Sequence, residues 1–161
     1  MYNKSTSRTK NRDKQREKTL EDLAMAVVNE IIRVEENGAL SFGNYELQEK
    51  TKVLDFEVEG RLYKAKTFYE VTKLKRDGAL VYESLPGTAV HQFMVTDNSV
   101  SFEVEGNGNS QITLELEPST EYKLMISDVT VGNIRSTISG KLSFSVDCAK
   151  EAQTVVLKKI K

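Results

Sequence analysis

Short apolar runs with a period of two residues recur along most of this chain. Leu142, Phe144 and Val146 alternate with two serines, and residues 112–117 alternate in the same way between apolar and polar side chains. Side chains two residues apart lie on the same face of a strand, so this pattern is typical of strands that are buried on one face. The pattern predicts an all-β protein.

Turn residues separate these runs at nearly regular spacing. Asn37-Gly38 and Asp77-Gly78 are typical of two-residue hairpin turns, and Asp97-Asn98 is a further candidate turn. About ten short strands punctuated in this way are typical of a sandwich or a barrel. We therefore expect an antiparallel β-sandwich or a partly closed barrel.

The N-terminal segment departs from this pattern. Residues 1–19 hold seven basic and two acidic side chains and almost no apolar ones, so burial cannot offset the entropy of ordering them. We expect residues 1–24 to be a basic disordered tail, with a short helix over residues 20–34 as the alternative. Codons for Leu20 to Met25 can also contain a ribosome-binding sequence followed by ATG. We therefore hypothesise that translation begins at Met25.

The β domain is expected over residues 25–161, with Pro86-Gly87 as the candidate division between two small lobes. The whole chain has a net charge of −1, but residues 25–161 carry 16 basic and 20 acidic side chains. A mildly acidic domain argues against nucleic acid as the main partner. Nucleic-acid binding is therefore expected only through the basic tail.

Composition excludes several kinds of chemistry. One cysteine, Cys148, and one histidine, His91, cannot form an internal disulfide or the usual zinc sites, so no metal or cofactor is expected. No run approaches the ~18 apolar residues of a transmembrane helix, and the N-terminal segment lacks the layout of a signal peptide. We expect a cytoplasmic protein with no membrane partner.

Two sets of side chains are candidates for binding. Aromatic side chains on a sheet face can stack on sugars or anchor a protein partner. Clustered arginines can hold an acidic ligand because the planar guanidinium matches a carboxylate. The aromatic candidates are Tyr63, Phe68, Tyr69 and Tyr82, and the arginine candidates are Arg33, Arg61, Arg76 and Arg135.

Four stretches carry a resemblance to known proteins: EENGALSFGNYEL (35–47), YKAKTFYEVTKL (63–74), VYESLPGTAVHQF (81–93) and GKLSFSV (140–146). With them, residues 25–161 resemble a small Firmicutes family whose members begin near the position of Met25. These proteins are often labelled endosialidase, which implies cleavage inside polysialic acid. Separately, residues 116–146 look like the end of bacterial immunoglobulin-like or fibronectin-like modules, which implies a β-sandwich.

The residues themselves do not supply the apparatus of a sialidase. The Asp-box of sialidases ends in Thr-Trp, and this chain has no Trp. A six-bladed propeller needs about 240 residues, whereas residues 25–161 number 137. We therefore expect a non-catalytic binding or assembly module that recognises a protein through a sheet face or an edge strand. Two alternatives stay open: a carbohydrate-active protein that binds or cleaves an acidic glycan, and nucleic-acid tethering by the tail.

Overall fold

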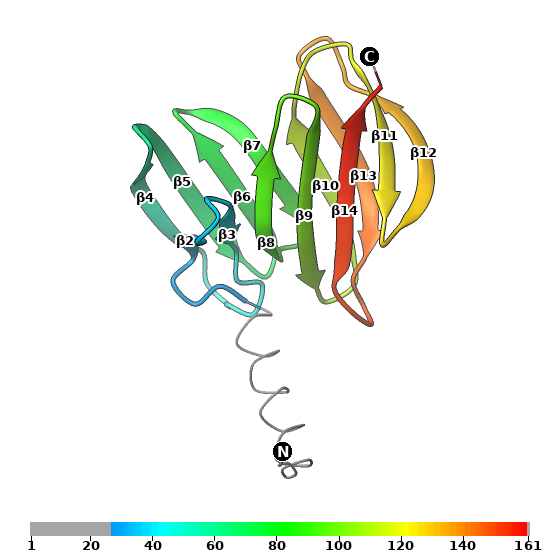
Figure 1. Ribbon diagram of the computed structural model, residues 1–161. Coiled ribbons are helices and arrows are strands. Elements are labelled where there is room, and N and C mark those ends of the chain that lie inside the picture. Colours follow the sequence, from blue (N-terminus) through cyan, green and yellow to red (C-terminus); the bar gives the residue numbers. More distant parts are fainter. Residues whose placement is uncertain (1–26, 161) are drawn as a thin grey trace, which may run out of the picture.

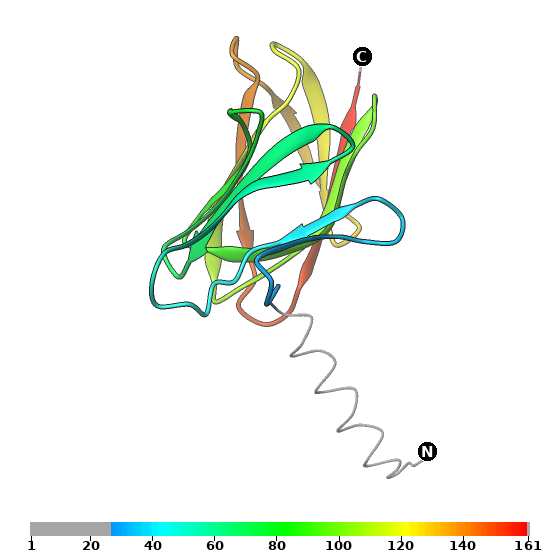
Figure 2. The ribbon, with the colours of Figure 1, turned by 90° about the vertical axis from the view of Figure 1, so that its left-hand side faces the viewer.

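The computed structural model describes residues 27–160, which form thirteen strands and no helix. The strands make two antiparallel sheets that pack face to face as a sandwich (Figure 1). Figure 2 shows the two layers from the side. The prediction of an all-β sandwich is confirmed, and the sheets are not closed into a barrel.

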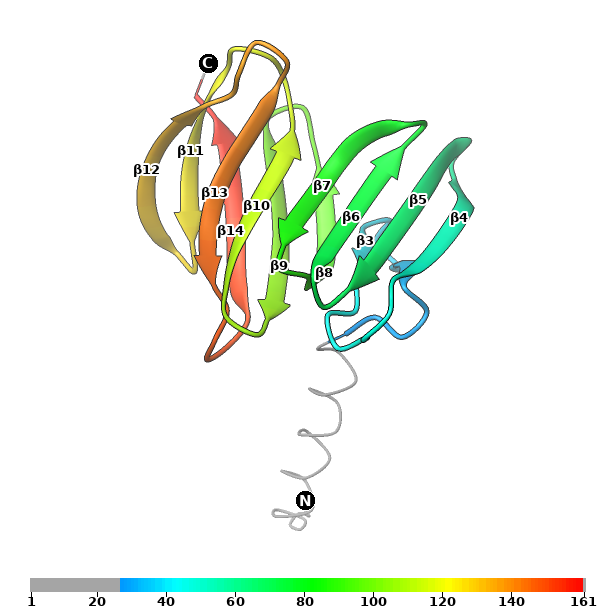
Figure 3. The ribbon, with the colours of Figure 1, turned by 180° about the vertical axis from the view of Figure 1, so that it is seen from behind.

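One sheet has six strands in the order β13-β10-β7-β6-β5-β4 (Figure 3). Strands β4, β5, β6 and β7 are consecutive in the chain, and each pairs with the next as a hairpin. Strands β10 and β13 extend the sheet beyond β7. The bounds are β4 Thr51–Val58, β5 Arg61–Phe68, β6 Val71–Arg76, β7 Ala79–Leu85, β10 Asn109–Glu115 and β13 Lys141–Asp147.

The other sheet has seven strands in the order β12-β11-β14-β9-β8-β3-β2. The last strand of the chain, β14, lies inside this sheet between β9 and β11. The bounds are β2 Ile32–Val34, β3 Leu40–Phe42, β8 Thr88–Val95, β9 Ser99–Gly106, β11 Glu121–Ile126, β12 Val129–Arg135 and β14 Gln153–Lys159.

The predicted N-terminal tail, residues 1–24, lies outside the described residues. The predicted helix over residues 20–34 is wrong for its described part, because residues 27–31 form turns and β2 begins at Ile32. Residue Ile31 has a positive φ of 77°, which ends any helical path before the strand. No helix in residues 27–160 is long and apolar enough to cross a membrane.

Four aromatic rings form the centre of the core between the sheets. Tyr82 from the six-stranded sheet meets Phe42 and Phe102 from the other sheet edge to face, with ring centroids 5.3 and 5.7 Å apart. Phe93 packs against the same group, 5.8 Å from Phe42. Edge-to-face pairs of this kind add to the stabilisation that apolar burial provides.

The residues Pro86-Gly87 carry the chain from one sheet to the other. They connect β7 to β8, and the Leu85-Pro86 peptide bond is cis. Each sheet contains strands from before and after this pair, and one apolar core draws on both parts. In the described residues the pair is therefore a crossing point between layers of one sandwich.

A buried cluster of hydroxyl groups surrounds this crossing point. The hydroxyls of Tyr82 and Ser84 each lie 2.8 Å from Thr88 Oγ1, at the start of β8. Thr72 Oγ1 on β6 donates to the Thr88 carbonyl (2.7 Å), accepts the Thr88 N–H (3.0 Å) and lies 2.7 Å from Thr67 Oγ1 on β5. All five side chains are buried, so these bonds satisfy polar groups that would otherwise destabilise the core.

Two glycines let the backbone segments approach closely here. A Cβ on Gly87 would lie 2.2 Å from the Phe68 carbonyl oxygen, and one on Gly43 would lie 2.4 Å from the Thr88 carbonyl oxygen. No side chain fits at either distance. The hydroxyl cluster and the two glycines together hold β5, β6 and β7 against the start of β8.

Replacing Thr88 by Val should lower the free energy of unfolding by about 2–4 kcal/mol, because two buried hydroxyls lose a partner. Urea unfolding measures this loss. Thr113→Val is the matched control, since Thr113 also pairs with a serine, Ser143, but on the outer surface. The control should change stability by no more than about 0.5 kcal/mol. Equal losses in the two variants would contradict the role given to the buried cluster.

Candidate functional site

Five lysines gather on the outer face of the six-stranded sheet, over β4, β5 and β6. They alone line a shallow depression of about 70 Å³: Lys52, Lys64, Lys66, Lys73 and Lys75. We call this surface the lysine face. It belongs to the outer side of the sheet that Figure 3 turns toward the viewer.

Strand register brings these lysines side by side. Lys52 pairs with Lys66, Lys66 with Lys73, and Lys64 with Lys75. Neighbouring strands are about 4.8 Å apart, and alternate residues along a strand about 6.6 Å apart. Like charges directly opposite one another destabilise a sheet. The lysine face therefore concentrates positive charge at a cost to stability.

Few carboxylates neutralise this charge. Glu83 on β7 lies opposite Lys73, and their charged atoms are 3.5 Å apart. In residues 27–160 no carboxylate lies within 4 Å of the charged nitrogens of the other four lysines. Partial burial and the neighbouring cations, Lys73 foremost, lower the pKa of Lys66. An anion over this face would relieve the repulsion.

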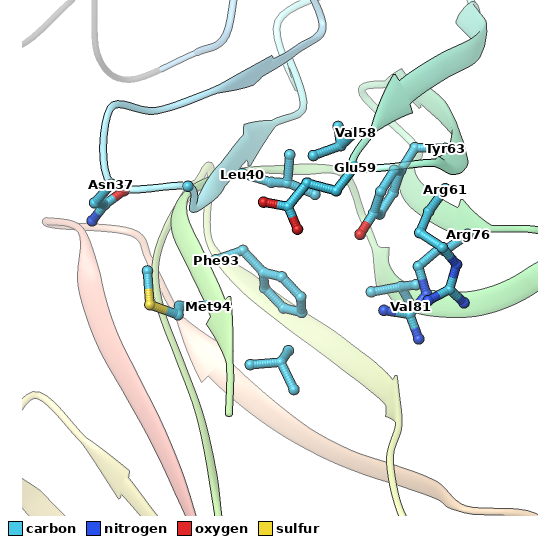
Figure 4. A pocket seen from close by; sticks show the side chains of 12 residues that line it. Asn37, Leu40, Val58, Glu59, Arg61, Tyr63, Arg76, Val81, Phe93 and Met94 are labelled. Atoms are coloured by element: carbon cyan, nitrogen blue, oxygen red, sulfur yellow. The ribbon is translucent and has the colours of Figure 1, made fainter. Parts of the chain in front are cut away.

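A second candidate site is a cleft between the two sheets, at the ends of the β4-β5 and β2-β3 hairpins. Its volume is about 470 Å³, and both sheets contribute to its walls. Phe93 and Leu40 line one side, while Tyr63, Arg61 and Arg76 line the other (Figure 4). The Glu59 carboxylate also points into this space.

The cleft brings together three of the side chains that the sequence singled out: Tyr63, Arg61 and Arg76. Arg61 is held by Asp77, whose carboxylate also accepts the Leu62 N–H at 2.9 Å. That backbone hydrogen bond, followed by the bond from Arg61, lowers the pKa of Asp77. Arg61 is thus already partnered. For Arg76 the described residues show no ion pair.

The other two arginine candidates lie elsewhere. Arg33 on β2 donates to Glu35 (3.0 Å) and to Glu30 (3.3 Å), so its charge is committed to its own strand region. Arg135 is exposed on the edge strand β12, opposite Glu121. Binding of an acidic glycan requires several of the four arginines in one pocket. Only two of them, Arg61 and Arg76, line the same cleft.

The aromatic candidates also lie in different parts of the structure. Tyr82 is fully buried (0% exposed) inside the hydroxyl cluster, so the prediction of a surface tyrosine is wrong for this residue. Its ring fills the aromatic core, and burial raises the pKa of its hydroxyl. Phe68 and Tyr69 lie at the end of β5, edge to face with centroids 5.3 Å apart. Phe68 shares the outward side of β5 with Lys64 and Lys66.

The lysine face was not predicted, although its signal is present in the sequence. Lys64 and Lys66 are two apart on one strand, and Lys73 and Lys75 are two apart on the next. Alternation places each pair on one face, and the intervening hairpin places the pairs side by side. The net charge of residues 25–161 is negative, so it does not indicate the basic surface on β4, β5 and β6.

Chemistry that needs a metal or a reactive thiol has little support in these sites. Among residues 27–160 no group of three or more His, Cys, Asp and Glu side chains could hold a metal ion. Cys148 is buried, and burial, with Asp147 and Glu105 nearby, raises the pKa of its thiol to about 11. The thiol is therefore protonated and weakly nucleophilic at neutral pH.

Comparison with known proteins gave no relative: no protein-family model, no curated protein and no solved structure matches this chain. The candidate sites therefore rest on the geometry of the chain alone.

Glu35 should make stability depend on pH. Burial raises the pKa of this carboxyl, but hydrogen bonds from the Ser41 hydroxyl and from Arg33 lower the pKa by more than burial raises it. The net pKa is therefore below the usual 4.5. A lowered pKa contributes stability above pH 4.5 that is lost as pH falls through the lowered value. Glu35→Gln should therefore reduce the free energy of unfolding by about 1–2 kcal/mol at pH 7 and by much less near pH 3.

Urea unfolding at the two pH values measures this difference. Glu36→Gln is the control, because Glu36 is exposed and adjacent. An equal loss for Glu35→Gln at both pH values would show that the charge of Glu35 has no such role.

Proposed function

We propose that this protein is a non-catalytic binding module whose lysine face recognises an anionic macromolecule. The observation that carries the proposal is the in-register array of Lys52, Lys66 and Lys73, with Lys64 and Lys75 beside it. Lysine ammonium groups are point charges that bind anions without demanding one planar geometry. Complementary charge steers encounter and fixes the register of a partner.

The position of the array supports a binding role over a purely structural one. These lysines lie on the outer face of the sheet, where they contribute nothing to the core. One carboxylate, Glu83, forms an ion pair with them in the described residues. A solvated face needs no such concentration of one charge, because mixed signs give better stability and equal solubility.

The cleft is a weaker basis for function. Its arginine wall is largely neutralised, since Asp77 holds Arg61, and Glu59 adds a second negative charge. The lysine face carries a larger net charge and lies on an open sheet surface that an extended partner can cross.

Affinity for an oligoglutamate of about eight residues, long enough to cross the face, tests the proposal by titration calorimetry at low and moderate salt. Lys64→Gln with Lys75→Gln should weaken binding about tenfold, or about 1.4 kcal/mol. Binding should also weaken as salt rises, because the attraction is screened.

The matched control is Lys123→Gln with Lys158→Gln. These residues are also a cross-strand lysine pair, but they lie on β11 and β14 of the other sheet. The control removes the same charge from the same kind of position, so it should leave the affinity nearly unchanged. Equal effects of the two double variants, or no measurable binding by the unaltered protein, would overturn the proposal.

A further inference from the structure

The lysine face is bounded by apolar side chains at both ends. Four residues of β5, each two apart, point to the outer side of the sheet. In order they are apolar, basic, basic and aromatic: Leu62, Lys64, Lys66 and Phe68. From Leu62 to Phe68 this row spans about 20 Å. The basic part is therefore short, and it occupies the middle of the row.

The Leu62 end has a hollow that suits an uncharged side chain. Leu54 and Leu62 are 57% and 46% exposed, and they border a depression of about 380 Å³ beside Lys64. Asp55 and Asp77 also line this depression, and Glu57 lies opposite Leu62. Arg61 neutralises Asp77, and Lys64 lines one side of the hollow, but Asp55 and Glu57 have no ion pair in the described residues. An anion is therefore less favoured here than in the middle of the row, whereas the exposed leucines favour an apolar group.

The Phe68 end is apolar as well. Phe68 pairs in register with Val71 on β6. Leu85, which is 52% exposed, follows Ser84 on β7, and Ser84 pairs with Thr72, the neighbour of Val71. Glu70, in the β5-β6 turn, is the nearest acidic residue along the chain. Lys50 also acts on Lys66 from this end, but Glu70 carries the opposite charge, so this end holds an anion less well than the middle of the row.

We propose that the partner is an extended acidic protein segment, with its acidic residues confined to the middle and one apolar residue at each end. This inference rests on the proposed function and names the chemistry of its ligand. A strand that packs face to face on a sheet presents alternate side chains to it, also at about 6.6 Å. Two acidic side chains two residues apart then meet Lys64 and Lys66, with apolar side chains over Leu62 and Phe68.

Polymers that are charged along their whole length fit this face less well. A nucleic acid, a polyphosphate chain or an acidic glycan would also place negative charge beside Asp55 and Glu57, and over Phe68 and Val71. The like charges at one end repel such a polymer, and at the other end its charges would lie over the apolar side chains of Phe68 and Val71. The order of apolar and charged positions therefore favours a protein segment.

Two end-blocked peptides of equal composition test the inference. The first, Leu-Ser-Glu-Ser-Glu-Ser-Leu, has its acidic residues in the middle, and the second, Glu-Ser-Leu-Ser-Leu-Ser-Glu, has them at the ends. Net charge, length and apolar content are identical. We expect the full-length protein to bind the first peptide at least about fivefold tighter, since apolar residues in solvent-accessible pockets contribute differences of this size.

Leu54→Gln with Leu62→Gln should reduce the preference between the two peptides, because it removes the apolar surface at one of the two ends. Both leucines are exposed, so the variant should fold. Val129→Gln with Val131→Gln, at exposed apolar positions on β12, is the matched control and should keep the preference.

The outcomes separate this inference from the proposed function. Oligoglutamate binding that depends on Lys64 and Lys75, with no preference between the peptides, would overturn the apolar ends and leave the binding face standing. Tighter binding of a polyphosphate chain than of the first peptide would overturn the protein segment in favour of a uniform polyanion. If neither peptide nor oligoglutamate binds, the proposed function itself fails.

Discussion

The hydroxyl cluster around Thr88 is the contact on which the arrangement of the two sheets depends. It lies where the chain crosses from β7 to β8, and it ties three strands of one sheet to the first residue of a strand in the other. Hydroxyls in an apolar core are tolerated only when they find partners. The partners lie on β5, β6, β7 and β8, with Tyr82 and Ser84 both on β7, so the full set of bonds forms only when all four strands are in place.

The same strands carry the lysine face, which couples the core to the surface. Thr67 and Thr72 point inward from β5 and β6, while their neighbours Lys66 and Lys73 point outward. A slip of one residue would bury lysines and expose threonines. The strand register that pairs Thr67 with Thr72 in the core also places Lys66 opposite Lys73 on the surface. The buried contacts therefore determine the arrangement of the surface lysines.

The sequence predicted the strands well because alternation and turn residues are local signals. The fold class, the Asn37-Gly38 and Asp77-Gly78 turns and the break at Pro86-Gly87 could all be read from neighbouring residues. Strand order could not, since the position of β14 between β9 and β11 depends on contacts far apart in the chain. Long-range pairing leaves little trace in a single sequence.

The candidate site was predicted only in part, for a related reason. The sequence suggested a surface position for Tyr82, but its hydroxyl is buried and bonded to Thr88, a residue of the other sheet. Arg33 was a candidate for ligand binding, but the structure shows that it forms ion pairs with Glu35 and Glu30. Arg61 and Arg76 line one cleft, but only the structure shows that Asp77 already forms an ion pair with Arg61. The lysine pairs were readable in the sequence, because alternation alone places them on one face.

Amide chemical-shift mapping can locate the surface that binds an anion. The folded protein would be titrated with oligoglutamate, and the shifts of its backbone amides followed by NMR. If the lysine face is the binding surface, the largest changes will fall on β4, β5 and β6, around Lys52, Lys64, Lys66, Lys73 and Lys75. Changes centred on the cleft at Arg61 and Arg76, or on the outer face of the seven-stranded sheet, would contradict this expectation.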